Sequence, residues 1–460
     1  MTLKTILATT AAAALTSSAL VTGALAAGHS PELPFAIDED DRFSWDTLAP
    51  FEEMDFSGET ITVFGPWLGP DKEFVENALA YFETATGADV QYSGSDGFEQ
   101  QIVIDLEGGS PPNIAVFPQP GLAGDMARRG FLTPLPDEVR EAVRSNYAAG
   151  DSWVALSSYE GQDGEEAFYA VPYKSDVKSL VWYSPDNFED FGYEVPETME
   201  DLIALSEQMV EDGNTPWCIG LGSGAATGWP ATDWVEDIML RTQSPEVYDQ
   251  WVNNEIPFDD PRVVEAIETY GSFAKNDGFV EGGGEAVAGT DFRESPKGLF
   301  TSPPSCFMHK QASFIPTFFG DDIEVGTDAD FFYFPAFESQ DLGQPVLGAG
   351  TFFGVTKDSE ATMALMEFLT SAIGHEVWMA QSGFLSPHTG ANPELYPNDA
   401  ARGQGEILTN ASTFRFDASD LMPGAVGAGS FWTGMVDYTT GTKSAEEAAA
   451  SIQESWNAVK

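Results

Sequence analysis

The chain has 460 residues, of which 42% are hydrophobic and 12% aromatic, so it can bury sizeable cores and does not have a disordered composition. Its length predicts two domains or lobes. The formal charge of -54, from 20 Lys+Arg against 74 Asp+Glu, excludes nucleic acid and anionic membranes as partners. Because the acids are spread along the whole chain, we interpret the negative charge as a feature that keeps the protein soluble in a saline habitat. The alternative is that it attracts a cationic ligand.

The first residues have the pattern of a secretory signal peptide. Lys4 precedes an apolar run over residues 6–21, and Ala24 to Ala26 fit the small-x-small cleavage rule. This pattern predicts a signal peptide over residues 1–26, a mature start near Ala27 and a soluble periplasmic protein. The alternative is a membrane anchor, which the short run, broken by Thr and Ser, disfavours.

Two cysteines, Cys218 and Cys306, are the complete set in the chain. In an oxidising exported compartment an even pair predicts one disulfide, and two buried free thiols are the alternative. None of the four histidines has a metal-site spacing, since His309 near Cys306 is not enough for zinc. We therefore predict no metal and no cofactor.

Strand and helix patterns alternate in the first part of the chain. After an acidic, proline-containing segment over residues 27–57, which we expect to be loosely packed, the elements follow in order. They are a strand at 59–64, a helix at 71–86, a strand at 89–92, a helix at 98–107, a strand at 113–117 and a short helix up to Arg129. This alternation predicts an α/β lobe with a largely parallel sheet.

Residues from about 172 to 335 are richer in helix and in irregular loops, and residues 278–289 (GFVEGGGEAVAG) are expected to be flexible surface. Strand patterns return at 331–337 and 350–355, a helix follows at 359–371, and the part from 397 on is mostly helical. Ligands of open α/β sheets bind at the carboxyl ends of strands. That rule points to the loops at Trp67, Ser95–Asp96, Gln119 and Gly350–Thr351.

Catalytic signatures are missing from the sequence. There is no phosphate-binding loop, no dinucleotide fingerprint, no nucleophile elbow and no zinc-protease motif. Carboxylates are so numerous that a glycosidase-type acid pair cannot be picked out. The sequence therefore gives no support for an enzyme.

Aromatic and polar side chains in the loops suit a sugar. Aromatic rings cover the C–H faces of a sugar, and amides, carboxylates and hydroxyls satisfy its hydroxyl rim. The aromatic candidates are Trp67, Trp182, Trp229, Trp234, Phe431 and Trp432, and the polar ones are Ser95, Asp96, Gln119, Tyr173, Lys174, Gln311 and Thr351. Trp182 lies in an apolar strand and is expected in a core, whereas Trp67 and Trp229 lie in Gly/Pro-containing loops.

Several segments together resemble the extracellular solute-binding proteins of bacterial ABC sugar importers, of the maltose-binding-protein type. They include ITVFGPWLGPDKEFVENALAYFETATGADV, PPNIAVFPQPGLAGDMARRGFLTPL, YAVPYKSDVKSLVWYSPDNFEDFGYEVPETMEDL, VLGAGTFFGV and SFWTGMVDYTTG. Within that family TPWCIGLGSGAATGWPATDWVEDIML and PPSCFMHKQASFI are most similar to the α-glucoside-binding branch. The resemblance covers nearly the whole mature chain.

This resemblance implies a type II periplasmic-binding-protein fold, with two α/β lobes, a hinge and a ligand cleft between them. It places Trp432 at the sugar-stacking tryptophan, Trp229 on the second lobe's side of the cleft, Tyr173 at the crossover, and Gly350 and Thr351 in the returning loop. Asp176 is expected on a hinge-side helix as a hydroxyl acceptor. Gln119 lies where the family uses a polar or acidic contact, and PQP replaces the usual acid there.

The function that follows is capture of a disaccharide such as trehalose, sucrose or maltose by hinge closure, and delivery by a monomer to permease subunits of the inner membrane. A binder of another glycoside or polyol, and a secreted glycoside hydrolase, are the alternatives. The expected boundaries are 58–173 and 346–395 for the first lobe, and 174–345 and 396–460 for the second. Trp229 is expected to face a sugar ring, and Trp234 to anchor its lobe.

Overall fold

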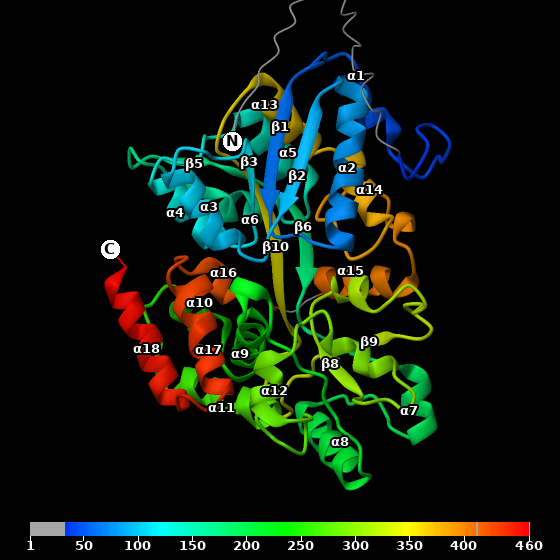
Figure 1. Cartoon of the computed structure of the whole chain (residues 1–460), viewed down its shortest axis with the longest axis vertical. Helices are drawn as coiled ribbons and strands as arrows, with labels where there is room; N and C mark the ends of the chain where they lie inside the picture. The colour runs from blue at the N-terminus through cyan, green and yellow to red at the C-terminus, as the bar shows by residue number, and fades with distance from the viewer. Residues whose placement is uncertain (1–32, 411–412, 460) are drawn as a thin grey trace, which may run out of the picture. The chain divides into compact units, whose positions relative to one another are not determined.

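A six-stranded sheet forms the centre of the first lobe in the computed structural model, which describes residues 33–410 and 413–459 (Figure 1). The strand order is β11-β10-β3-β1-β2, and β6 also pairs with β10. β1 lies parallel to β2 and β3, whereas β10 runs antiparallel to β3 and β6. The strands are β1 (Thr60–Gly65), β2 (Asp89–Gly94), β3 (Ile114–Phe117), β6 (Ala170–Val177), β10 (Pro345–Val355) and β11 (Thr413–Phe416).

Lobe 1 denotes this sheet with the helices that pack around its core. They are α1 (Ala49–Glu52), α2 (Pro70–Thr86), α3 (Phe98–Glu107), α4 (Pro120–Arg128), α5 (Asp137–Asn146), α6 (Gly150–Leu156), α13 (Glu360–Phe368) and α14 (Ala372–Met379), beside the hairpin of β4 (Ser158–Glu160) and β5 (Glu166–Phe168). α2 begins at Pro70 and ends before Gly87, whose φ of 75° stops the helix. The predicted elements up to Arg129 agree with the structure within about two residues.

Lobe 2 denotes the elements around two further apolar cores. It contains the strands β7 (Leu180–Tyr183), β8 (Met308–Lys310) and β9 (Asp330–Tyr333), paired in the order β8-β7-β9. Its helices are α7 (Pro185–Phe191), α8 (Met199–Glu211), α9 (Trp229–Thr242), α10 (Pro245–Val252), α11 (Pro261–Ala274), α12 (Gly283–Gly289), α16 (Ala418–Leu421), α17 (Trp432–Thr439) and α18 (Ala445–Ala458). It also contains the 3₁₀ helices η2 (Gly224–Ala226), η3 (Ser295–Phe300) and η4 (Ile315–Phe318), and the π-helix η6 (Val426–Phe431). The fold is therefore an assembly of two α/β lobes, as expected.

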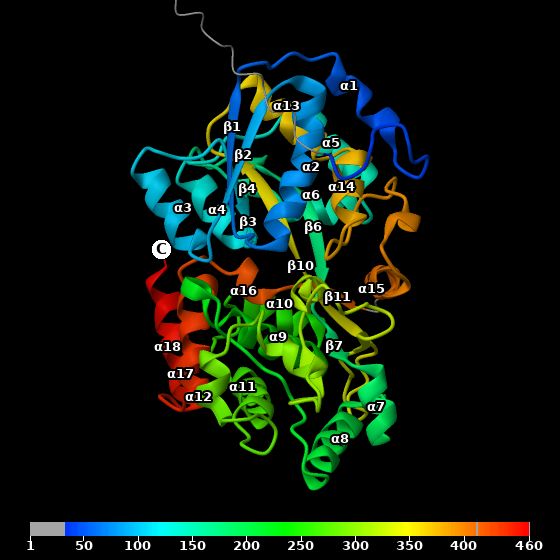
Figure 2. The same cartoon turned by 45° about the vertical axis from the view of Figure 1, so that its right-hand side comes forward.

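Two strands connect the lobes. Figures 1 and 2 both show β6 and β10 running from the sheet of lobe 1 toward lobe 2. Phe352 of β10 belongs to the core of lobe 1, and Leu347 of the same strand to a core of lobe 2. α15 (Asp399–Asn410) and η5 (Pro393–Leu395) follow α14 on the way back into lobe 2.

The segment before β1 corrects one expectation. Its described part, which includes η1 (Trp45–Thr47), is firmly packed: Phe43, Leu48 and Phe51 are buried in the core of lobe 1. Ser44 donates from its backbone N–H and its hydroxyl to Glu376 of α14. Aromatic residues therefore hold this acidic segment against the lobe, and the prediction of loose packing was wrong. The predicted signal peptide, residues 1–26, lies outside the described residues.

Three local predictions also need correction. Residues 283–289 form α12, with Val287 buried, so the glycine-rich segment is not simply flexible surface. Asp176 lies in β6 and not on a helix, because the alternating run Ala170–Val177 pairs with β10. Gly350 and Thr351 lie within β10 and not in a loop, at an irregularity in its pairing with β6.

A disulfide joins Cys218 and Cys306 within lobe 2, with their Cα atoms 5.4 Å apart. The predicted bridge is thereby confirmed. Among the described residues, no helix has the length and apolar character needed to cross a bilayer.

Candidate functional site

A cavity of about 160 Å³ lies between the two lobes. Lobe 1 and the connecting strands contribute Pro66, Trp67, Leu68, Asp71, Ser95, Asp96, Glu99, Pro118, Gln119, Lys174, Asp176, Ala349, Gly350 and Thr351. The other wall is made of Lys178, Ser223, Ala226, Trp229, Asp233, Phe292, Arg293, Phe314, Phe318, Ser419, Asp420 and Trp432. Loops after β1, β2 and β3 supply much of the first wall, which is where open α/β sheets place ligands.

Two tryptophans of lobe 2 meet in this cavity. Trp229 is the first residue of α9, and Trp432 is the first residue of α17; they pack together with Ala226 and Ala428. Gly228 makes this approach possible, because its φ is 119° and a Cβ there would come within 2.4 Å of the Trp432 carbonyl oxygen. Only glycine tolerates both conditions. The Gly-Trp-Pro sequence thus places the Trp229 indole at the cavity wall, partly buried against Phe292.

A third tryptophan faces the cavity from lobe 1. Trp67 follows β1, and its ring contacts Trp378 edge-on, with the ring centres 4.8 Å apart. The hydroxyl of Tyr92 accepts from the Trp67 backbone N–H at 2.8 Å, which fixes the loop. Flat apolar surfaces therefore border the cavity from both lobes, as a ligand with C–H faces requires.

Buried polar atoms without a partner gather at the same cavity. In the described part of the chain, Asp71 Oδ1, Gln119 Oε1, Thr351 Oγ1 and Trp432 Nε1 have no hydrogen-bond partner, and all four residues line it. An unsatisfied buried polar group costs about 1–3 kcal/mol. A polar ligand in the cavity would satisfy these atoms, which is the strongest geometric sign of a binding site.

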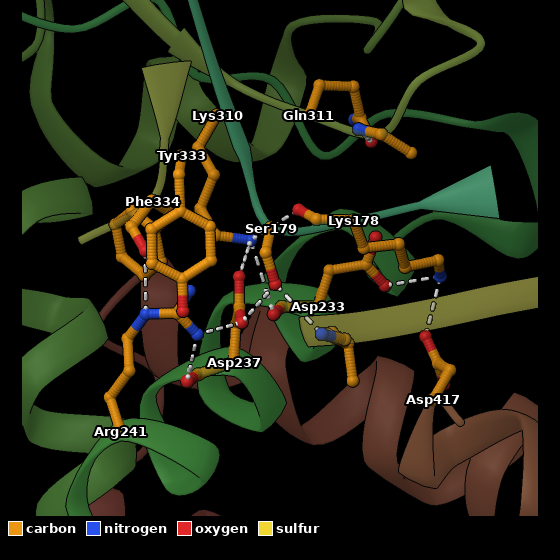
Figure 3. Close-up of polar contacts among 12 residues, drawn as sticks. Lys178, Ser179, Asp233, Asp237, Arg241, Lys310, Gln311, Tyr333, Phe334 and Asp417 are labelled. Atoms are coloured by element: carbon orange, nitrogen blue, oxygen red, sulfur yellow. Dashed lines mark hydrogen bonds and ion pairs between the residues drawn. The ribbon is translucent and has the colours of Figure 1, made fainter. Parts of the chain in front are cut away.

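A network of buried charges supports the lobe 2 wall (Figure 3). Asp233, Asp237 and Arg241 are four residues apart on α9, so their side chains share one face. Lys178 Nζ lies 2.8 Å from Asp233 and 2.6 Å from Asp417. Asp237 pairs with both Arg241 and Lys310, and the Arg241 guanidinium also donates to the Phe334 carbonyl.

Burial raises the pKa of several cavity carboxyls. It raises the pKa of Asp71 to about 6 and that of Glu99 to about 7, against ordinary values of 3.8 and 4.5. The pKa of Asp233 rises to about 7 for the same reason, although Lys178 opposes the shift. Burial, and then the charge of Asp417, raises the pKa of Asp420 well above its usual range. Ionised carboxylates in this cavity are therefore costly unless something donates to them.

Asp233 also belongs to a group of three buried acids with the geometry of a metal site. Asp233, Glu236 and Asp417 each bring one oxygen within 4.8 Å of the others. Lys178 already binds Asp233 and Asp417, and the backbone N–H groups of Ala418 and Ser419 donate to Glu236. An ammonium group thus serves as the cation of this cluster.

Contacts between the lobes close the cavity at its rim. Arg293 of lobe 2 forms an ion pair with Asp96 of lobe 1 at 2.5 Å. The backbone N–H of Gly424 donates to Asp125 of α4 at 2.9 Å. In the described conformation the two lobes therefore touch at both of these places.

The predicted ligand-binding residues all line the cavity except Tyr173 and Gln311. Tyr173 is fully buried and donates its hydroxyl to the Gly374 carbonyl, so it packs in the core of lobe 1. Gln311 is 4% exposed and accepts from the Ala312 N–H through its side chain, next to its own backbone. Trp182, Trp234 and Phe431 are also core residues.

Several cavity residues were missed from the sequence. They are Asp71, Glu99, Lys178, Asp233, Phe292, Arg293, Phe314, Phe318, Ser419 and Asp420. With 74 acids in the chain, a single carboxylate carries little signal. Asp71 could have been found, because it follows the first strand and begins a helix, where side chains face the crevice.

The family model for bacterial extracellular solute-binding proteins matches residues 65–376, and the chain belongs to this family. The α-glucosides-binding periplasmic protein AglE of Rhizobium meliloti is 59% identical over 431 residues, which are 93% of this chain and 94% of AglE. The osmoprotective compounds-binding protein GgtB of Synechocystis is 43% identical over 86% of this chain and 92% of its own.

A solved structure shares the fold. The bacterial solute receptor AcbH superposes with a TM-score of 0.72 at 20% identity, covering 87% of this chain and 99% of AcbH. At that identity the likeness concerns the fold alone.

Proposed function

We propose that this chain is the periplasmic substrate-binding component of an ABC importer and captures an α-glucoside, a disaccharide such as trehalose, sucrose or maltose. The similarity to AglE over nearly the full length of both chains supports the ligand class. The observation that carries the proposal is the cavity itself, where four buried polar atoms without partners lie beside three indoles. Indoles cover the sugar faces and the polar atoms pair with its hydroxyls.

Capture occurs by hinge closure and involves no covalent chemistry. The chain crosses between the lobes within β6, within β10 between Leu347 and Phe352, and near residues 395–396. Opening of the cleft would bend β6 and β10, whose pairing is irregular between Gly350 and Phe352. The ion pair between Asp96 and Arg293 forms as the rim closes. The closed form then docks, as a monomer, on the permease subunits in the inner membrane. The signal peptide over residues 1–26 directs export.

Calorimetric titration of the purified chain with trehalose, sucrose, maltose and glucose tests the proposal. We expect saturable binding of at least one disaccharide, stronger than that of glucose. Recovery of the bound sugar unchanged separates a binding protein from a glycoside hydrolase, which would release free glucose. Absence of binding to every α-glucoside would overturn the proposed ligand class.

A second candidate ligand class is an osmoprotective glycoside or polyol, which the 43% identity to GgtB favours. The same titration extended to sorbitol and to glycerol α-glucosides separates the two classes. A clear preference for those compounds over the disaccharides would favour this second class.

A further inference from the structure

All positive charges of the cavity are already engaged. Among the described residues, Lys174, Lys178 and Arg293 are the cationic side chains of its lining. Lys174 lies 3.8 Å from Asp176, Lys178 lies 2.8 Å from Asp233, and Arg293 pairs with Asp96. Each is therefore neutralised within the protein.

The same three cations also make cation–π contacts with aromatic rings. Lys174 Nζ lies 5.0 Å from the centre of the Phe314 ring, and Lys178 Nζ 5.5 Å from that of Trp229. The Arg293 guanidinium covers the Phe292 ring at 4.3 Å. Moving a cation toward a ligand would break both an ion pair and a ring contact, so these groups are poor anion receptors.

Three acids of the same lining have no cation. In the described part of the chain, no ion pair reaches Asp71, Glu99 or Asp420. Asp71 is 5% exposed with Oδ1 unpartnered, and Glu99 is 7% exposed, with Gln119 donating to it at 3.1 Å. Asp71 and Glu99 belong to lobe 1, and Asp420 to lobe 2. Carboxyl acceptors therefore face the ligand from both sides.

We infer that this cleft selects its ligand by charge: it accepts an uncharged glycoside whose hydroxyls donate to Asp71, Glu99 and Asp420, and it rejects sugars that carry a phosphate or a carboxylate. The inference rests on the proposed function and names its substrate class more narrowly. Each of these carboxyls can accept a hydrogen bond from a ligand hydroxyl, whereas an anion meets three acids and no free cation.

Matched neutral and anionic sugars test this directly. The pairs are trehalose with trehalose 6-phosphate, maltose with maltobionate, and methyl α-glucoside with methyl α-glucuronide, each titrated at pH 8 and fixed ionic strength. We expect each anionic member to bind at least about 100-fold more weakly than its neutral partner, since two or more carboxylates repel it at short range. Asp71→Asn and Glu99→Gln should each reduce this ratio about tenfold, because each removes a carboxylate that repels the anionic sugar at pH 8.

Glu73→Gln is the matched control, because Glu73 is exposed and lies on the helix that carries Asp71. It removes one acid from the chain and should leave the ratio unchanged. Circular dichroism verifies the fold of each variant. Anionic members that bind as tightly as their neutral partners would overturn the charge selection alone. If no sugar of the panel bound, the proposed function would fall, and this inference with it.

Discussion

The two walls of the cavity use polar groups in opposite ways. On the lobe 2 side, Lys178, Asp233 and Asp417 form a buried network, and Asp237, Arg241 and Lys310 continue it below the surface. On the lobe 1 side and its connecting strand, Asp71, Gln119 and Thr351 each leave an oxygen without a partner. The acids Asp233 and Asp417 of lobe 2 are paired within the protein, whereas the lobe 1 side, like Trp432 Nε1 across the cavity, has polar atoms that need a ligand.

Because of this difference, some mutations should reduce the stability of the fold and others the affinity for the ligand. Breaking a satisfied buried network leaves a charge stranded in the fold, so the cost falls on stability. Changing a group whose partner is the ligand costs affinity, and can leave the fold unaffected or improve it. The predictions below use this separation, in order of decreasing effect.

Arg241→Ala should have the largest effect. It removes a fully buried guanidinium that pairs with Asp237 and donates to the Phe334 carbonyl, and we expect a loss of about 3–5 kcal/mol in the free energy of unfolding. Urea denaturation measures it. Arg262→Ala, which removes an exposed partner of Asp260, should cost about 1 kcal/mol or less. Equal losses of unfolding free energy in the two variants would contradict the proposed difference between buried and surface ion pairs.

Removal of the disulfide should come next. Cys218→Ser with Cys306→Ser opens a bridge with a sequence separation of 88. Loop-closure entropy predicts a loss of up to about 4 kcal/mol. The thermal midpoint of the wild type should fall on reduction, and that of the double variant should not respond. A wild-type midpoint insensitive to reductant would show that the bridge contributes little to stability.

Glu99 should make stability depend on pH in a defined direction. Burial raises the pKa of Glu99 to about 7 in the folded chain, against an ordinary value of 4.5. The folded state therefore binds the extra proton, and this stabilisation is lost as pH rises through about 7. Linkage gives a loss of about 3 kcal/mol between pH 4.5 and 8. Glu99→Gln lacks this loss and should gain stability relative to the wild type as pH rises.

Urea denaturation of both chains at pH 5, 6, 7 and 8 measures that difference. Burial lowers the pKa of His309 to about 4 and that of His375 well below its usual value, so these residues destabilise both chains alike as pH falls below 6.5. Their contributions cancel in the comparison. A difference that stays constant over this pH range would contradict the raised pKa of Glu99.

Thr351→Val should have the smallest effect on the fold. The change removes a buried hydroxyl without a partner from the cavity wall and keeps the side-chain shape. We expect the free energy of unfolding to stay equal or rise slightly, while affinity for the disaccharide bound by the wild type falls about fivefold to tenfold. Calorimetry and urea denaturation on the same preparation measure both. A loss of stability without a loss of affinity would place the hydroxyl outside the binding function.

Regular periodicity made lobe 1 predictable. The alternation in residues 60–65 and the stripe through Phe74, Ala78 and Phe82 gave its first strand and helix almost to the residue. Tryptophans next to Gly or Pro, such as Trp67 and Trp229, could be predicted as ligand-binding because a tryptophan in such a loop is less often a core residue. Most cavity acids were not found, since burial distinguishes them from the many exposed acids; for Asp71 alone, the position after the first strand was a usable signal.

Other errors arose where tertiary pairing decides the local structure. Thr351 lies in a strand because β10 pairs with β6 before and after it, at Gly350 and Phe352, and with β3 from Phe352 on, which no local pattern reveals. Residues 33–57 are acidic, yet a few aromatic residues suffice to pack them onto α2 and α14. The acidic residues of this segment suggested an exposed, loosely packed chain, but its aromatic side chains decide how it packs against lobe 1.

The central position of β10 has a consequence for how this chain folds. β10 pairs with β3, β6 and β11, although it begins only at residue 345. A chain that has emerged only up to α12 holds β1, β2 and β3 but lacks the strand that completes their sheet. Lobe 1 therefore finishes late despite starting first, and its early strands keep an open edge until β10 pairs with it.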